Sequence, residues 1–208
     1  MTAADPAASA DPAAAADPAA SADPLSGVDP VAYRQAVGRF ATGILVASTQ
    51  FDGIPHIMTV NAFTSVSLEP LRVLFCAEKI ARFHDAVLAT GTWAVSVLDE
   101  SSEKLSRWLA TRGRPLEGQL DGVPYHPGPV TGAPILDGSL SALECRMTAV
   151  HDGGDHSIVV GEVLAATTFR PHDQPLVFFG GRYRRLAPDP AADPAGPDDP
   201  APPESAAT

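Results

Sequence analysis

The segment His56-Ile-Met-Thr-Val-Asn-Ala-Phe-Thr-Ser-Val-Ser-Leu-Glu-Pro70 decides how the rest of the chain is interpreted. Apolar residues alternate with small polar ones until the pattern stops at a proline. In a β-strand, successive side chains point to opposite faces, so one face should be polar and the other apolar. The predicted polar wall contains Thr59, Asn61 and Ser65 or Ser67, while Val60 and Val66 are predicted to face a core. A flat polar heterocycle would fit such a wall.

Composition separates a central domain from two unusual ends. With 208 residues, 45% of them hydrophobic, the chain is long enough for one ordinary domain with a sizeable core. Asp-Pro recurs every six positions between residues 5 and 24, and residues 188–208 return to Ala, Pro, Asp and Gly. Neither end can build a core. We therefore predict disordered tails at 1–28 and 188–208 around a single domain at 29–187.

The acidic charge belongs mostly to those ends. The net charge is −11, but the two tails hold nine of the 25 acidic residues and none of the 14 basic ones. The central region is therefore nearly neutral, and no basic stripe interrupts it. This pattern gives no support to nucleic-acid binding.

Two further features concern the cell compartment. No cationic N-terminal region precedes an apolar run, and no apolar stretch approaches the roughly 18 to 20 residues of a membrane span. We expect a soluble cytoplasmic protein without membrane contact. Cys76 and Cys145 lie in apolar strand-like runs, where buried free thiols are favoured over a disulfide or a nucleophile.

Local patterns predict many strands and few helices. Asp29 can cap a helix from Pro30 to Phe40, and Asp52-Gly53 marks a hairpin turn. A Gly- and Pro-rich stretch at 113–138 predicts a long loop, which we expect to cover a site or an interface. Further helices are predicted at 82–88, stopped by Gly91, and from Ser101 or Ser102 to before Gly113; strands are predicted at 44–49, 71–76, 92–98, 140–150, 157–168, 176–179 and 182–186. Hairpins without βαβ alternation favour an antiparallel barrel over a doubly wound sheet.

The common catalytic motifs are missing from the sequence. It contains no Gly-x-Gly-x-x-Gly, Walker loop, Gly-x-Ser-x-Gly, His-Glu-x-x-His or Cys-x-x-Cys pattern. Hydrolase, kinase and zinc-enzyme interpretations are therefore disfavoured, and no metal site is predicted.

Two polar clusters remain as candidates for a site. Asp155 and His156 follow a flexible Gly153-Gly154 turn that would deliver them to the mouth of a strand. Lys79 and Arg82 lie between a strand and a helix, where helix amides could help them bind a phosphate. The alternatives are a polar hairpin with an incidental histidine and a solvated charged face.

The order of these clusters resembles the flavin reductase-like family, the short-chain NAD(P)H:flavin oxidoreductases with an FMN-binding split-barrel fold. The matching segments are Phe40-Ala-Thr-Gly43, Met58 to Pro70, Trp93 to Leu98, Leu143-Glu-Cys145, Gly154-Asp-His156, Gly161-Glu-Val163 and Pro175 to Phe179 before Tyr183. They cover nearly all of residues 30–187. The resemblance implies a mainly β protein, an antiparallel split β-barrel with Greek-key connections and a few short helices.

The resemblance also implies roles for numbered residues. The Thr59 to Ala62 stretch would border the isoalloxazine ring, and His156, with Asp155 beside it, matches the histidine near the nicotinamide site. The flavin-binding candidates are Thr42, Thr59, Val60, Asn61, Ala62, Ser65, Ser67, Cys76, Ala77, Lys79, Arg82 and Tyr183; the catalytic candidates are His156 and Asp155.

The activity that the resemblance implies is transfer of hydride from NADH or NADPH to FMN, or to FAD, by a homodimer. Reduced flavin would then diffuse to a separate flavin-dependent monooxygenase. Ala62 stands where the family often has serine, and Lys79-Ile80-Ala81 replaces frequent hydroxyl residues, so FMN, FAD and a deazaflavin all stay open. A flavin- or haem-binding module of the same barrel type, without NAD(P)H turnover, is the competing interpretation.

Overall fold

The computed structural model describes residues 27–187, so the predicted tails fall almost entirely outside the described residues. The chain divides into a short unit that ends at Val37 and a main unit that begins at Gly38. The short unit contains helix α1, Pro30–Val37. As predicted, Asp29 caps this helix by accepting the Ala32 N–H at 3.1 Å. The helix ends three residues earlier than predicted, where Gly38 disfavours its continuation.

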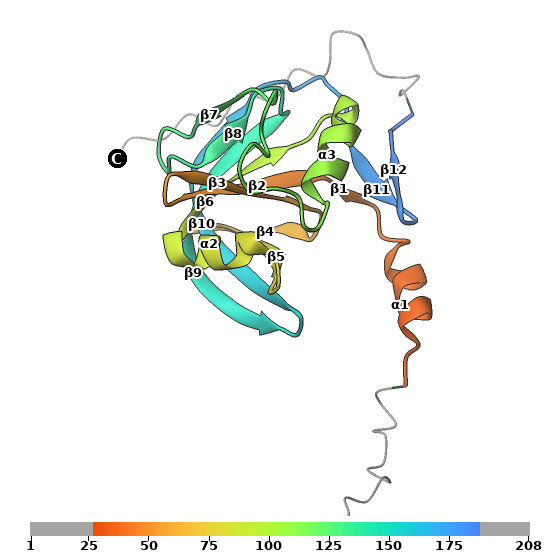
Figure 1. Cartoon of the computed structure of the whole chain (residues 1–208). Coiled ribbons are helices and arrows are strands. Elements are labelled where there is room, and N and C mark those ends of the chain that lie inside the picture. The colour runs from red at the N-terminus through yellow and green to blue at the C-terminus, as the bar shows by residue number, and fades with distance from the viewer. Residues whose placement is uncertain (1–26, 188–208) are drawn as a thin grey trace, which may run out of the picture. The chain divides into compact units, whose positions relative to one another are not determined.

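The main unit is mostly strands, with short helices between them (Figure 1). Its elements are β1 Thr42–Gly43, β2 Leu45–Phe51, β3 Ile54–Val60, β4 Phe63–Leu68, β5 Leu71–Glu78, α2 Arg82–Thr90, β6 Thr92–Val97, η1 Glu100–Ser102, α3 Glu103–Leu109, β7 Tyr125–Pro127, β8 Pro134–Leu136, β9 Ser141–Gly153, β10 His156–Thr168, β11 Val177–Phe179 and β12 Arg182–Arg184. Among the described residues, no helix combines the length and hydrophobicity needed to cross a bilayer.

The largest sheet must curve because its two edge strands follow each other in the chain. Its seven strands lie in the order β3-β2-β6-β9-β10-β5-β4, with every neighbouring pair antiparallel. In a flat sheet of this size the edges would lie about 29 Å apart, given a strand spacing of about 4.8 Å. Only Asn61 and Ala62 separate β3 from β4, and such a link reaches about 11 Å at most. The sheet therefore curls until its edges approach, as a barrel requires.

Curling buries both faces of the central strands. The first five residues of β2 are all buried. Leu45 packs in a cluster with Phe75 and Trp93, whereas its neighbour Val46 packs in a second cluster with Leu98. Because adjacent strand residues point to opposite faces, the two clusters lie on opposite sides of β2.

Two helices pack against the β2–β3 hairpin. Figure 1 shows α2 below this hairpin and α3 above it, and each helix contacts both strands. Gly91 ends α2 as predicted, in a left-handed conformation with φ 66°, and its N–H donates to the Val87 carbonyl at 3.0 Å. The two helices therefore support the β2–β3 hairpin.

The start of α3 differs from the prediction that a serine caps it. Ser101 and Ser102 instead donate their hydroxyl hydrogens to the buried Asp99 carboxylate, at 2.9 Å and 2.5 Å. Burial alone would raise the pKa of Asp99, but the hydrogen bonds from Ser102 and Ser101 and the charge of Arg170 lower it overall. An ionised Asp99 thus fixes the turn that leads into α3.

Most predicted elements are present, with shifted ends. The Asp52-Gly53 turn has φ values of 49° and 76°, which suit a two-residue hairpin. The predicted loop at 113–138 contains the short paired strands β7 and β8, which the sequence did not indicate. The prediction that Val66 faces a core is wrong, because its side chain is 49% exposed and the β4–β5 register shifts beside it.

Gly161 offers a test of this packing. An added Cβ would lie 2.0 Å from the Trp93 ring and 3.0 Å from the Arg146 carbonyl oxygen, and Trp93 is fully buried. We expect Gly161→Ala to destabilise the protein by about 1–3 kcal/mol or more, measured by urea unfolding. Gly43→Ala is the control, since nothing lies within 4 Å of its added Cβ. Equal stabilities of the two variants would contradict the prediction.

Candidate functional site

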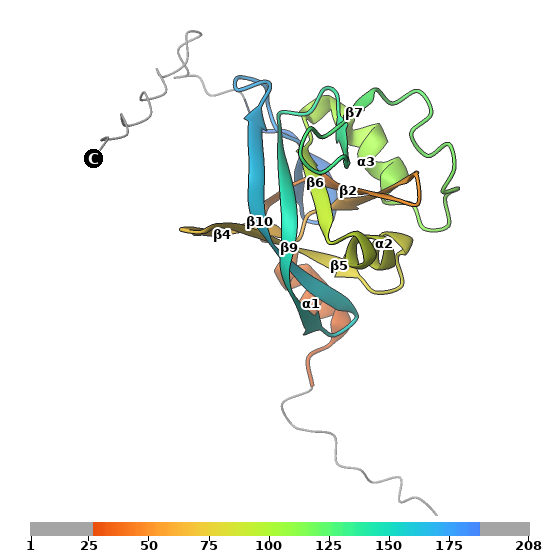
Figure 2. The ribbon, with the colours of Figure 1, turned by 90° about the vertical axis from the view of Figure 1, so that its left-hand side faces the viewer.

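A cavity of about 480 Å³ lies where the curled sheet meets the two helices. One wall is β3 with the Asn61-Ala62 link, and the opposite wall is the end of β5 and the start of α2. The end of α3 and the loop after it, through Gln119, complete the lining. Figure 2 shows α2, α3 and this loop on the same side of β6, β9 and β10. The expectation that part of the 113–138 loop covers a site agrees with this arrangement.

The β3 wall presents few free hydrogen-bonding groups. The Thr59 hydroxyl donates to the Ser106 carbonyl at 2.8 Å, and Asn61 Nδ2 lies 3.5 Å from Thr42 Oγ1. The Ala62 carbonyl accepts the Cys76 N–H at 3.0 Å, which joins the link to β5. Asn61 itself is exposed and lines the cavity, so a ligand can reach its side chain.

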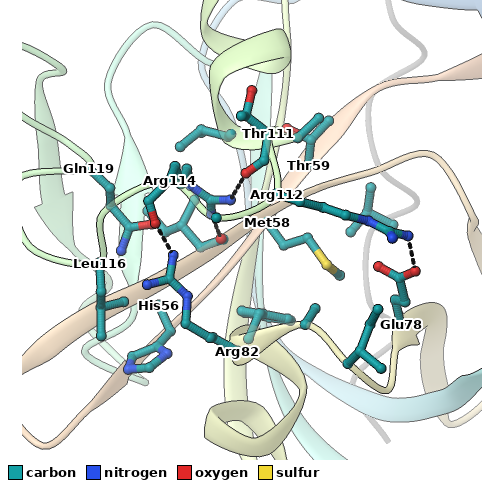
Figure 3. Close-up of a pocket in the computed structure, with 18 of the residues that line it drawn as sticks. His56, Met58, Thr59, Glu78, Arg82, Thr111, Arg112, Arg114, Leu116 and Gln119 are labelled. Carbon is teal, nitrogen blue, oxygen red and sulfur yellow. Dashed lines mark hydrogen bonds and ion pairs between the residues drawn. The ribbon is translucent and has the colours of Figure 1, made fainter.

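Positive charge gathers at the start of α2 and in the loop after α3. Arg82 donates to the Arg114 carbonyl, and Arg114 donates to the Thr111 carbonyl at 3.2 Å and to the Ile57 carbonyl. Arg112 forms an ion pair with Glu78. Figure 3 shows Arg82 and Arg114 side by side, with the Arg112 pair at the other end. Burial, and secondarily the charge of Arg82, lower the pKa of Arg114.

The N-terminus of α2 adds to this positive field. Ala81 stands at the N-cap position and makes no side-chain hydrogen bond to the first turn. Ile80, Ala81, Arg82 and Phe83 all line the cavity. Uncapped amides at a helix N-terminus bind anions well, and the helix dipole has the same sign as Arg82. This part of the cavity therefore suits a phosphate.

A clamped hairpin brings His156 to the cavity. His156 begins β10, lines the cavity and has its Nδ1 2.7 Å from Asp155 Oδ1. The hydrogen bond from His156 lowers the pKa of Asp155. The Lys79 N–H donates to the Asp155 carbonyl at 3.0 Å, and the Lys79 ammonium pairs with Asp152. Lys79 thus ties β5 to the tip of the β9–β10 hairpin.

Comparison with known proteins identifies the family. Residues 37–187 match the model of the flavin reductase like domain. The chain belongs to the flavin reductase-like family. The match covers most of the predicted 29–187 domain, and the split-barrel resemblance inferred from the sequence is confirmed.

Individual flavin reductases are similar over most of their lengths. The chain is 43% identical to the NADH-dependent FAD reductase of Streptomyces globisporus over 160 residues, 76% of this chain and 87% of that one. It is 36% identical to the HsaB reductase subunit of a flavin-dependent monooxygenase from Mycobacterium tuberculosis, over 76% of this chain and 82% of that one. The structure of the Streptomyces globisporus NADH:FAD oxidoreductase SgcE6 with NAD and FAD fragments superposes with a TM-score of 0.73, at 41% identity, covering 78% of this chain and 95% of that one.

The cavity of this flavin reductase-like protein gathers half of the residues that the sequence singled out. Thr59, Val60, Asn61, Ala62, Cys76, Arg82 and His156 line it. The others lie outside: Thr42, Ser65, Ser67, Ala77, Lys79, Asp155 and Tyr183. Ala77 is fully buried in the core, and the Tyr183 hydroxyl bonds to Ser106 at 2.9 Å. The register shift between Ser65 and Ser67 turns β4 away from the wall that simple alternation predicts.

Sequence reasoning missed several lining residues of the flavin reductase-like cavity. His56, Arg112, Arg114 and Gln119 belong to it, and three of these come from the loop that follows α3. The one available signal was the Thr111-Arg-Gly-Arg114 run, in which two arginines flank a glycine directly after a helix. The hydrogen bond from Arg114 to the Ile57 carbonyl of β3 joins residues 57 positions apart, which local periodicity does not report.

The two thiols of the flavin reductase-like domain should react slowly. Burial raises the pKa of Cys76, and burial with the charge of Glu144 raises the pKa of Cys145 to about 12. Because the thiolate is the reactive form, we expect labelling by a disulfide reagent at pH 8 to be much slower than that of free cysteine. Cys76 should react before the fully buried Cys145, and both should react in guanidinium. Rapid labelling of the folded protein would contradict these shifts.

Proposed function

We propose that the protein is an NAD(P)H-dependent flavin reductase whose flavin binds in the cavity beside Thr59 to Ala62. One observation carries the proposal: a single cavity in a flavin reductase-like domain joins that segment, His156 and the uncapped start of α2. Its volume of about 480 Å³ lies within the range of small-molecule and cofactor sites. FMN and FAD are both substrates to test, with NADH or NADPH as the donor.

A bound flavin would supply the chemistry, as the acceptor of hydride from a dihydronicotinamide. The chain's part is to hold both rings in contact and to exclude water from them. Met58 and Val60, which line the cavity, would offer apolar surface to the flavin ring. Asn61 donates toward its polar edge, where negative charge grows during reduction.

His156 has the proposed role of positioning the nicotinamide. Its Nδ1 bonds to Asp155, which fixes the ring and leaves Nε2 free for a ligand. The carboxamide or ribose of the nicotinamide nucleotide offers the matching groups. No covalent step involves His156, and Asp155 acts through it as a positioning residue.

The proposed phosphate contact is Arg82 with the first turn of α2. Both face the cavity, and charge-assisted hydrogen bonds to phosphate are among the stronger ones in proteins. Lys79, the other cation expected there from the sequence, is instead paired with Asp152 outside the cavity.

A binding module without NAD(P)H turnover is not favoured, because the similar proteins carry reductase names. By analogy with the monooxygenase reductase subunit, we propose that a flavin-dependent monooxygenase uses the reduced flavin. The cytoplasm, where reduced pyridine nucleotide is made, is the proposed location.

We also propose that the protein is a homodimer. β4 is an edge strand, and the exposed fractions of Val66, Leu68 and Leu71 around its end are 49%, 82% and 52%. Apolar side chains on a sheet edge favour association. Light scattering of the wild type at micromolar concentration should give twice the mass of one chain. Leu68→Glu should lower the measured mass. A wild-type protein with the mass of one chain would contradict the proposal.

The activity can be measured as NADH consumption with and without added FMN or FAD. We expect His156→Ala to lower kcat/KM for NADH about tenfold, the effect of losing roughly one hydrogen bond in the transition state. His151→Ala, on the exposed face of β9, is the matched control. No oxidation by the wild type at any flavin concentration would reject the reductase function. A normal rate in His156→Ala would remove only the role of His156.

The phosphate contact can be separated from ring binding by comparing FMN with riboflavin. We expect Arg82→Gln to lower the affinity for FMN at least tenfold, measured by calorimetry. The affinity for riboflavin should be nearly unchanged, because riboflavin has no phosphate. Lys79→Gln is the matched control, since Lys79 does not line the cavity. If Arg82→Gln and Lys79→Gln lowered the FMN affinity equally, the phosphate would not bind at Arg82.

A further inference from the structure

A hydrogen bond outside the cavity joins the two elements that carry the proposed ligand contacts. His84 Nε2, on α2, lies 2.9 Å from Ser157 Oγ, on β10. His84 stands two residues after Arg82, and Ser157 directly follows His156. The bond therefore connects the start of the helix that presents the arginine to the start of the strand that presents the histidine.

His156 and Ser157 point to opposite faces of the sheet, as strand alternation requires. His156 lines the cavity together with its cross-strand neighbour Glu78, whereas Ser157 does not line it. Ser157 lies opposite Ala77 of β5, and Ala77 packs in the core with Phe83 of α2. The Ser157 hydroxyl therefore reaches α2 from the face of the sheet that is turned away from the ligand.

The His84 ring is held at both of its nitrogens. Its Nδ1 lies 2.9 Å from Asp85 Oδ1. An ionised carboxylate only accepts hydrogen bonds, so Nδ1 donates, and in the neutral ring Nε2 accepts the Ser157 hydroxyl. The His84 side chain is 12% exposed and Ser157 is 5% exposed. Water has little access to this bond, so breaking it would leave a buried polar group unpaired.

A serine, a histidine and an aspartate in hydrogen-bonded order also occur in hydrolytic triads, but the burial here differs. A nucleophilic serine must reach its substrate, whereas Ser157 is buried and lies outside the cavity. The aspartate of a triad is buried, whereas the Asp85 side chain is 90% exposed. These three residues therefore connect two elements and do not form a catalytic centre.

Other contacts near the hairpin tip involve the turn before α2 and not the helix. The Lys79 N–H donates to the Asp155 carbonyl at 3.0 Å, and the Lys79 ammonium pairs with the exposed Asp152. Exposed ion pairs contribute little to stability. Among the described residues, the bond between His84 and Ser157 is the one side-chain hydrogen bond from α2 to β10. It is therefore the contact best placed to fix the helix against this strand.

We propose that His84 and Ser157 are positioning residues, which set the distance between the flavin phosphate at Arg82 and the nicotinamide at His156. The inference rests on the proposed function, which places the two ligands there. Hydride transfer needs the two rings in contact, and a misplacement of about 1 Å can lower a rate about a hundredfold. A shift of α2 relative to β10 would move a phosphate-bound flavin away from the nicotinamide.

Four variants separate this positioning role from a role in folding. Ser157→Ala leaves His84 Nε2 unpaired and should unfold at a lower urea concentration than the wild type. The double variant His84→Phe with Ser157→Ala replaces both partners with apolar groups and should regain stability. Ser157→Thr restores a hydroxyl. Thr90→Val is the matched control, because it removes a 2.8 Å bond to Thr49 at the other end of α2, away from the cavity.

The decisive measurement is kcat for NADH oxidation with saturating FMN and with saturating riboflavin. We expect Ser157→Ala and the double variant to lower kcat with FMN about tenfold, and kcat with riboflavin less than about twofold. Riboflavin has no phosphate, so it is not tied to α2. Ser157→Thr should restore the rate with FMN, and Thr90→Val should keep the wild-type ratio of the two rates. The affinity for FMN should be unchanged, because Arg82 stays in place.

A second readout does not depend on turnover. A nicotinamide that stacks on a reduced flavin gives a long-wavelength charge-transfer absorbance. We expect NAD⁺, added without oxygen to the protein with photoreduced FMN, to give a weaker band in Ser157→Ala than in Thr90→Val. The bands with photoreduced riboflavin should be equal in the two variants.

Two results would overturn the proposal. An equal loss of kcat with FMN and with riboflavin in the double variant would mean that the bond only supports the fold. Wild-type rates with both flavins would mean that the rings are placed without it. The proposed function fails separately, because wild-type NADH oxidation tests it, whereas the ratio of the two rates in the variants tests the positioning role.

Discussion

The two-residue link between the edge strands is the constraint on which the rest of the structure depends. Asn61 and Ala62 must join strands at opposite ends of a seven-stranded order. No flat sheet permits this, so the sheet curls and both faces of β2 become buried. The same link carries the polar side chain of Asn61 to the edge of the cavity. The same two residues therefore close the sheet and form part of the cavity wall.

The second determinant is the loop after α3, which gives a nearly neutral domain a strongly positive cavity. Arg112 and Arg114 enter from this loop and meet Arg82 of α2. Only Arg112 has a carboxylate partner lining the cavity, in Glu78. Repulsion between neighbouring arginines is unfavourable. Hydrogen bonds to backbone carbonyls offset part of it, and an anionic ligand would offset more. The local charge comes from the arginines that line the cavity, whereas most of the net charge of the chain comes from its tails.

The sequence predicted the parts of this structure that are local. Turn residues such as Asp52-Gly53 and the stop at Gly91 act through their own backbone conformations. Residues 59–62, which the family resemblance singled out, line the cavity. Alternation failed at Val66, because the β4–β5 register shifts beside it. His56 and Gln119 escaped notice because only the folded arrangement brings β3 and the loop after α3 to one cavity.

Lys79 and Arg82 are close in the sequence but have different contacts in the fold. Three positions apart, they form one basic cluster in the sequence, and both are expected at a phosphate. In the fold, β5 ends at Glu78 and α2 begins at Arg82. Arg82 lines the cavity, while Lys79, in the turn between the two elements, pairs with Asp152. The Lys79 backbone also holds the Asp155 carbonyl, next to His156. One cation would thus contact the ligand, and the other holds the hairpin that carries the histidine toward it.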